Sequence, residues 1–301
     1  MLGCMWRSVL PLASAILLGV GCPSLVGLPA HGAASYVTLT PTLVEAGSPV
    51  LMRVQAAPGA VLEGEWLGRR LEFFPARRGS VWFALAGVDV EAPAGPSTLK
   101  IVVKDRKGVI RDLSLAVEIH AAHYRTESLT VAPEFVEPGA EELQRIHADE
   151  EVKKQVFSQS APLPLWRGSF RLPAAARRTD SFGTRRMFNG KLASVHKGMD
   201  FRARVGTPVR AANSGVVVLA RPLYYEGNCV VIDHGLGLYT LSMHLSRIDV
   251  AEGQHVAPGA HLGLSGATGR ATGPHLHWAV RWQGAYLDPA KLLRINLAGV
   301  R

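Results

Sequence analysis

Near its C-terminus the chain carries the stretch Gly273-Pro274-His275-Leu276-His277-Trp278-Ala279-Val280. Its apolar and aromatic residues predict a strand from Leu276 to Val280 that follows a Gly-Pro turn. Residues two apart in a strand point to the same face of a sheet, so His275 and His277 direct two imidazoles to one place. The stretch therefore predicts a β-sheet with a pocket that both histidines face.

A second set of possible ligands lies about 75 residues upstream, in His196-Lys197-Gly198-Met199-Asp200. Taken alone, His196 and Asp200 would be read as a surface ion pair. Together with one of the paired histidines they make a set of two nitrogens and one oxygen, which suits Zn²⁺ and leaves a fourth position for water. The other paired histidine is then free to move protons beside that water. The combined pattern predicts a hydrolase site.

The sequence around these residues resembles the lysostaphin/LytM-type zinc metallopeptidases, which cut peptide bonds in bacterial peptidoglycan. The resemblance runs from about Leu165 to Leu293. It rests on these motifs, which occur in the family's order: Ser181-Phe182-Gly183-Thr184-Arg185-Arg186, Phe188-Asn189-Gly190, His196-Lys197-Gly198-Met199-Asp200-Phe201, Ile232-Asp233-His234-Gly235, Met243-His244-Leu245-Ser246, Gly263-Leu264-Ser265-Gly266-Ala267-Thr268-Gly269 and Thr272-Gly273-Pro274-His275-Leu276-His277-Trp278.

The resemblance implies a role for each of five residues. His196, Asp200 and His277 are the implied ligands of one Zn²⁺ per chain. His275 is the implied general base, and His244 is implied to orient the attacking water or stabilise the oxyanion, with an exchange of these two roles as the alternative. The chain has no His-Glu-x-x-His motif, so no carboxylate base of that kind is at hand and histidine must transfer the proton.

The same resemblance leaves the substrate cleft less well defined. Arg185, Arg186 and Asn189 are candidates for binding peptide carboxylates, with a purely structural loop as the alternative. Family members usually carry an aromatic residue two positions before the histidine at 244, where this chain has Ser242. That departure concerns the wall of the groove and removes no metal ligand. His234 is expected to serve a turn.

Composition narrows the class of protein. The chain has 301 residues, of which 48% are hydrophobic and 19% charged, as expected for a globular protein. The formal net charge of +9 predicts attraction to polyanions. Lys and Arg are scattered, without a long basic run, which argues against nucleic acid as the partner. For an exported protein the anionic cell envelope is the expected partner of this charge, with solubility alone as the alternative; that the partner is peptidoglycan is what the family resemblance implies.

The N-terminus has the layout of a targeting segment. Arg7 precedes an apolar run from Val9 to Leu18, and small residues follow up to Ala34, so residues 1–34 are expected to be a secretory signal peptide. Lipidation of Cys22 and a retained leader are the alternatives, and only these would associate the protein with a membrane. Each reading places the protein outside the cytoplasm, in the periplasm or cell envelope. Cys229 is then the one cysteine of a mature chain, and its apolar setting predicts a buried thiol.

The remaining pattern predicts a mostly β protein in two parts. Short strands at regular spacing over residues 36–121 predict an immunoglobulin-like β-sandwich. Residues 122–164 are expected to be a linker with a helix over 139–157, since acidic residues come first and basic residues last. Residues 165–301 are expected to form a compact antiparallel β domain in which Leu276–Val280 closes the sheet. The resemblance implies that this is the peptidase domain with a zinc groove.

Two functions remain open at this point. The first is a secreted zinc endopeptidase acting on cross-links or bridges of peptidoglycan. The second is a non-catalytic module of the same fold that binds peptidoglycan and regulates other hydrolases, as do relatives that lack a ligand or a catalytic histidine. All five positions are filled here, which favours the enzyme. An active site covered by the N-terminal half or the linker is a further hypothesis.

Overall fold

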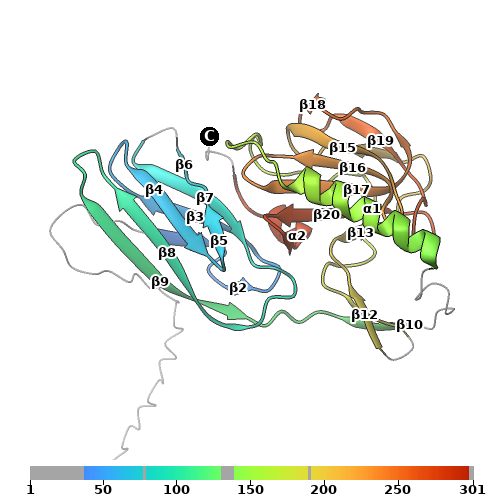
Figure 1. The fold of residues 1–301 in the computed structure, drawn as a ribbon, viewed down its shortest axis with the longest axis horizontal. Coiled ribbons are helices and arrows are strands. Elements are labelled where there is room, and N and C mark those ends of the chain that lie inside the picture. The colour runs from blue at the N-terminus through green and yellow to red at the C-terminus, as the bar shows by residue number, and fades with distance from the viewer. Residues whose placement is uncertain (1–36, 77–78, 130–138, 189–190, 298–301) are drawn as a thin grey trace, which may run out of the picture. The chain divides into compact units, whose positions relative to one another are not determined.

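A computed structural model describes residues 37–76, 79–129, 139–188 and 191–297. The expected signal peptide at 1–34 and Asn189 lie outside these residues. The mostly β fold predicted from the sequence is confirmed (Figure 1). Of the helices within the described ranges, none is both long and apolar enough to cross a membrane.

The N-terminal half consists of two sheets. One has the order β1-β3-β7-β6 and the other the order β2-β9-β8-β4-β5. The strands are β1 (Val37–Thr40), β2 (Val44–Glu45), β3 (Pro49–Gln55), β4 (Val61–Trp66), β5 (Arg69–Leu71), β6 (Phe74–Pro75), β7 (Val81–Gly87), β8 (Gly95–Lys104) and β9 (Ile110–His120). Both sheets contribute apolar side chains to the buried core. Gly108 has a φ of 81° in the turn that joins β8 to β9, as the hairpin prediction requires.

The stretch expected to be a linker contains a helix and also a strand. The helix α1 (Ala140–Phe157) matches the expected position to within one residue. The strand β10 (Thr126–Leu129) was not expected, and it pairs in parallel with β11 (Arg185–Phe188), which also pairs with β12 (Lys191–Val195). This segment contains no alternating apolar run, so its strand state depends on the distant partner.

The C-terminal half is built on a sheet in which every pairing is antiparallel, with the main order β13-β20-β17-β16-β15-β18. Its strands are β13 (Met199–Phe201), β14 (Pro208–Arg210), β15 (Gly215–Leu223), β16 (Gly227–Asp233), β17 (Leu238–Ile248), β18 (His255–Val256), β19 (His261–Ser265), β20 (Leu276–Trp282) and β21 (Ala285–Leu287), and the helix α2 (Pro289–Leu292) follows. The expectation that Leu276–Val280 closes the sheet is wrong. β20 lies inside the sheet, because it pairs with β17 along one edge and with β13 along the other.

Both faces of the central strands β16 and β17 are buried. On one face Val230, Ile232, Leu238 and Leu245 belong to the main core. On the other, Val231, Tyr239, Leu241, Met243 and Ala279 form a second apolar cluster, and α1 residues Val152, Val156 and Phe157 pack against it. Ala279 shares its face of β20 with His277, because the two are two positions apart in the strand. α1 lies across one face of this sheet (Figure 1). The packing of α1 against the cluster that contains Ala279 shows that this is the face on which His277 lies.

Candidate active site

Three side chains predicted to bind metal converge at one end of this sheet. Asp200 on β13 lies directly opposite His277 on β20, and His196 lies in the loop before β13. His277 Nδ1 lies 2.8 Å from Asp200 Oδ1, and His196 Nε2 lies 3.1 Å from each of these two atoms. Two residues of different strands and one from a loop thus point their ligand atoms at a common centre.

The His196 ring is oriented by the backbone around it. Its Nδ1 lies 2.9 Å from the carbonyl oxygen of Ser181. A carbonyl only accepts hydrogen bonds, so Nδ1 carries the proton and Nε2 presents its lone pair to Asp200 and His277. The backbone of His196 is also paired to its neighbours, donating to Thr184 and accepting from Gly183. A neutral imidazole held in this tautomer is the form that binds a metal.

Asp200 is held in the ionised state. Burial by itself would raise the pKa of this carboxyl group, but the adjacent imidazoles of His196 and His277 outweigh burial and hold the pKa well below its usual range. Burial also lowers the pKa of His277, which favours its neutral form. The electrostatics therefore favour an ionised carboxylate at Asp200 and a neutral ring at His277, which is the charge state that a cation requires.

Asp180 and Arg186 lie next to the cluster of His196, Asp200 and His277. Asp180 was not predicted from the sequence. Asp180 accepts hydrogen bonds from Arg186 Nη2 at 2.9 Å and from Thr184 Oγ1 at 2.9 Å. Arg186 Nη2 lies 3.7 Å from Asp200 Oδ2. Burial would raise the pKa of Asp180, but the bonds from Arg186 and Thr184 and the nearby His196 lower it. Asp180 thus fixes Arg186 beside Asp200, a predicted ligand. In the sequence, only the position of Asp180 directly before the Ser181 motif could have indicated this role.

Gly198 makes room for His277. A Cβ atom at position 198 would lie 2.6 Å from Cε1 of the His277 ring and 2.8 Å from the carbonyl oxygen of Trp278. Ordinary contacts of a Cβ atom begin at 3.4 Å. The glycine between the two predicted ligands His196 and Asp200 is therefore required by the close approach of β20.

His275 faces the cluster, as the His-x-His spacing predicts. Its Nδ1 donates to the carbonyl oxygen of Gly273 at 2.8 Å, so Nε2 carries the lone pair. That Nε2 lies 3.9 Å from Asp200 Oδ1. The residue precedes β20 and forms a single bridge with Gly266, which fixes its backbone. A free lone pair next to the ligand atoms suits a proton acceptor.

His244 reaches the site through an irregularity in β17. Between β16 and β17 the register shifts: Asn228 is opposite Leu245, whereas Val230 is opposite Ser242. The extra residue in this bulge lets His244 adopt a φ of 60°. Its ring lies 4.7 Å from the His275 ring, centroid to centroid. Nδ1 donates to the carbonyl oxygen of Thr268 at 2.8 Å, which leaves a lone pair on Nε2.

Burial lowers the pKa of His244 to about 4, with smaller contributions from the charges of His275 and His277. The ring is therefore neutral near pH 7. A neutral ring whose proton is on Nδ1 can accept a hydrogen bond through Nε2 but cannot donate one there. Of the two roles considered for His244, the geometry favours orienting a water over stabilising an oxyanion.

The other residues considered in the sequence, Arg185, Ser242 and His234, do not line the cluster. Arg185 is exposed and, as the strand neighbour of Arg186, has its side chain on the opposite face. Ser242 is buried opposite Val230 and Trp278, on the face of β17 away from Met243, so it does not line the cluster of His196, Asp200 and His277. His234 is fully buried, donating to the Ser214 carbonyl and accepting from Thr240 Oγ1, both at 2.8 Å.

Residues 194–289 match the model of Peptidase family M23. The chain contains an M23 peptidase domain. The matched range begins just before His196 and includes Asp200, His244, His275 and His277. This M23 domain therefore contains every residue expected to bind the metal or to transfer protons.

Known relatives agree with this assignment. Peptidoglycan DD-endopeptidase ShyA of Vibrio cholerae is 45% identical over 107 residues, which is 36% of this chain and 24% of ShyA. DD-carboxypeptidase/endopeptidase Mpg of Neisseria meningitidis is 43% identical over 98 residues, 33% of this chain and 23% of Mpg. The match thus spans about a quarter of the length of these curated relatives.

A crystal structure from Pseudomonas aeruginosa assigned to peptidase M23 extends the likeness. It is 27% identical, with a TM-score of 0.61, and the alignment covers 86% of this chain and 93% of that one. The similarity of fold therefore continues beyond the M23 domain into the N-terminal half of the chain.

Proposed function

We propose that this protein is a zinc metalloendopeptidase that hydrolyses peptide cross-links or bridges of bacterial peptidoglycan. One observation carries the proposal: His196 Nε2, Asp200 Oδ1 and His277 Nδ1 lie within 3.1 Å of one another, beside the rings of His275 and His244. If the three residues only stabilised the fold, the two further imidazoles of His275 and His244, each with an Nε2 lone pair unpaired among the described residues, would not be needed beside them.

The donor set fits zinc. Two neutral imidazoles and one carboxylate balance only half of the charge of Zn²⁺ and leave a position open, as in catalytic sites. When bound, the zinc would lower the pKa of a coordinated water and polarise the scissile carbonyl group. His196, Asp200 and His277 would hold it, with Ser181 and Arg186 fixing the orientation of two of these ligands.

The chain's own residues then handle the protons. His275, whose Nε2 faces the ligands, takes the proton of the attacking water and later delivers it to the leaving amine. His244, with its proton held by Thr268, orients that water by accepting a hydrogen bond through Nε2. Both rings are fixed at Nδ1 by a backbone carbonyl, so they need little rearrangement during the reaction.

The substrate follows from the relatives. ShyA and Mpg are named for endopeptidase activity, and ShyA for action on peptidoglycan, so we infer a DD-type cross-link as the bond cut. Such a substrate requires export to the periplasm or cell envelope, in agreement with the expected leader. Asn189 is proposed to contact the peptide. Arg185 is not assigned this role, because its side chain lies on the face of the strand opposite Arg186. Arg186 is held by Asp180 and is assigned to orient Asp200.

Digestion of purified peptidoglycan tests this function. The full chain with zinc should convert cross-linked dimers into monomers, detected by mass, and both His196→Ala and a chelator should abolish the conversion. A zinc-loaded wild type that binds peptidoglycan and cuts nothing would contradict the enzyme and support the regulatory alternative.

A further inference from the structure

The turn at residues 224–226, which connects β15 to β16, is attached to α1 at two points. Asp149 Oδ2 accepts a hydrogen bond from the backbone N–H of Tyr224 at 2.6 Å. One turn further along the helix, Lys153 Nζ lies 2.8 Å from Glu226 Oε1. α1 is thus bound to both ends of this turn.

The same turn holds His244. The carbonyl oxygen of Glu226 accepts from the backbone N–H of His244 at 2.8 Å. Gly227 packs against Thr268, and the Thr268 carbonyl accepts from the His244 ring. Glu226 therefore contacts α1 with its carboxylate and the candidate catalytic histidine with its backbone.

His244 depends on such support. A φ of 60° is unusual for a residue with a side chain and is kept only where the surroundings enforce it. In the bulge, His244 is displaced from regular pairing with β16, and Glu226 supplies the partner for its backbone N–H. A shift of the turn would therefore move the His244 backbone and its ring.

The bond between Lys153 and Glu226 is well shielded from water. The two side chains are 24% and 14% exposed. Glu226 Oε2 is buried and has no hydrogen-bond partner among the described residues, so Lys153 is the counter-ion on which this carboxylate depends. Burial alone would lower the pKa of Lys153, but Glu226 raises it, so the amine stays charged.

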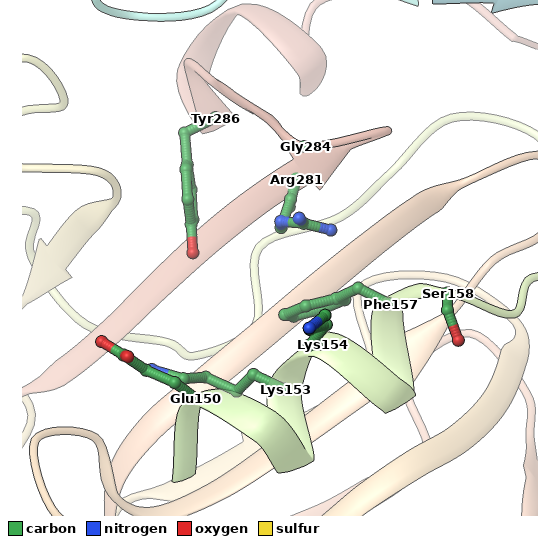
Figure 2. Close-up of a pocket in the computed structure, with 8 residues that line it drawn as sticks. All are labelled: Glu150, Lys153, Lys154, Phe157, Ser158, Arg281, Gly284 and Tyr286. Atoms are coloured by element: carbon green, nitrogen blue, oxygen red, sulfur yellow. The ribbon is translucent and has the colours of Figure 1, made fainter. Parts of the chain in front are cut away.

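The helix itself is fixed on the sheet. Phe157 at its end packs edge-on against Tyr239, with ring centroids 5.1 Å apart, and the Arg281 guanidinium lies 3.9 Å from the centre of the Phe157 ring. Figure 2 shows Lys153 on the same helix as Phe157, with Arg281 and Tyr286 opposite. These contacts set the position from which Lys153 reaches Glu226.

We infer that Lys153 of α1 is a positioning residue for His244, acting through Glu226. This inference rests on the proposed function for its effect on catalysis, but the geometric coupling is independent of it. According to this inference, α1 helps to position an active-site residue, although α1 lies outside the M23 match. A chain that begins at Leu165 lacks this support and is expected to cut more slowly than the full chain.

Two measurements on the full chain with zinc test the inference. The first is hydrogen exchange at the His244 backbone amide, followed by NMR. Lys153→Met should speed this exchange at least about tenfold, while the His234 amide, which donates to Leu238 in the same sheet, keeps its wild-type rate. The second is peptidoglycan cleavage, where kcat should fall about tenfold or more with KM nearly unchanged.

Matched variants serve as controls. Lys154→Met changes the neighbouring lysine, which is 76% exposed and pairs with Glu151 at 3.5 Å, and both readouts should stay at wild-type values. Lys153→Arg keeps the cation and should restore most of kcat. If the uncompensated Glu226 carboxylate prevents Lys153→Met from folding, Lys153→Met combined with Glu226→Gln removes both charges and should show the same two effects.

The outcomes separate the two proposals. If the folded variants leave His244 exchange at the wild-type rate, the inference is wrong, whatever the activity. If wild type cuts nothing while His244 exchange responds to Lys153→Met, the coupling holds and the proposed function fails. Wild-type kcat in a variant with faster His244 exchange would refute the catalytic consequence.

Discussion

Replacing Gly198 by alanine tests the metal site through one added methyl group. Gly198 lies between His196 and Asp200, and its φ is not in the left-handed region, so alanine fits the backbone without strain. The change adds no charge and removes no ligand. At a site with free space, such a substitution stabilises a fold by about 0.4–1 kcal/mol. Any loss must therefore come from contact with the neighbouring strand.

The size of that contact follows from the distances. The added Cβ would lie 2.6 Å from His277 Cε1 and closer still to His277 Nε2, where ordinary contact begins at 3.4 Å, so the ring must retreat by at least about 0.8 Å. The backbone cannot move away easily, since Met199 and Asp200 pair directly with Trp278 and His277. Displacements near 1 Å cost on the order of 100-fold in rate, and disturbed ligand orientation costs roughly 10–100-fold in metal affinity.

We therefore expect Gly198→Ala to bind zinc about 10–100-fold more weakly than wild type and to cleave peptidoglycan correspondingly more slowly. Competition with a chromogenic chelator measures the affinity. Gly273→Ala is the matched control, because Gly273 adjoins the same site and a Cβ there meets nothing within 4 Å. Equal zinc affinities for the two variants and wild type would refute the packing argument.

Three other predictions address separate parts of the structure. His244→Ala should reduce kcat by about 100-fold or more and leave zinc affinity near the wild-type value, since His244 is not among the three ligands; a large loss of affinity in equilibrium dialysis would contradict that division of roles. Burial lowers the pKa of His234 to about 4, below the 6.5 of an unperturbed histidine, so the unfolded state takes up a proton that the folded state excludes. The free energy of unfolding should then fall by about 3 kcal/mol between pH 6.5 and 4, and urea titrations of His234→Gln should show a smaller fall; an equal fall in both would exclude this histidine as the cause. Burial also raises the pKa of the Cys229 thiol, so a thiol reagent should label it only in denaturant, and rapid labelling of the native protein would show that the thiol is accessible.

Much of the site could be predicted from the sequence because its residues lie in regular segments. His275 and His277 follow strand alternation, and Asp200 needs only to pair opposite His277. The spacing along a strand determines which side chains share a face. The motif around Asp200 identifies the strand that pairs with the one carrying His277.

Other parts depend on contacts that sequence spacing does not encode. His244 reaches the site through a bulge and a φ of 60°, whereas regular alternation would not define its direction. Asp180 acts through Arg186, which comes from a strand paired with the unexpected β10. Both faces of β16 and β17 are buried, so their sequences lack the alternation that would have shown which face carries the site.

The most direct test of the account is a zinc titration of metal-free full-length protein, with cleavage of peptidoglycan cross-links measured at each step. Cleavage should be absent without metal and should reach its maximum at one equivalent of zinc in wild type, whereas Asp200→Asn should stay inactive at that amount. Full cleavage by the metal-free protein, or none at saturating zinc, would contradict the assignment of His196, Asp200 and His277 as the zinc site of a peptidase.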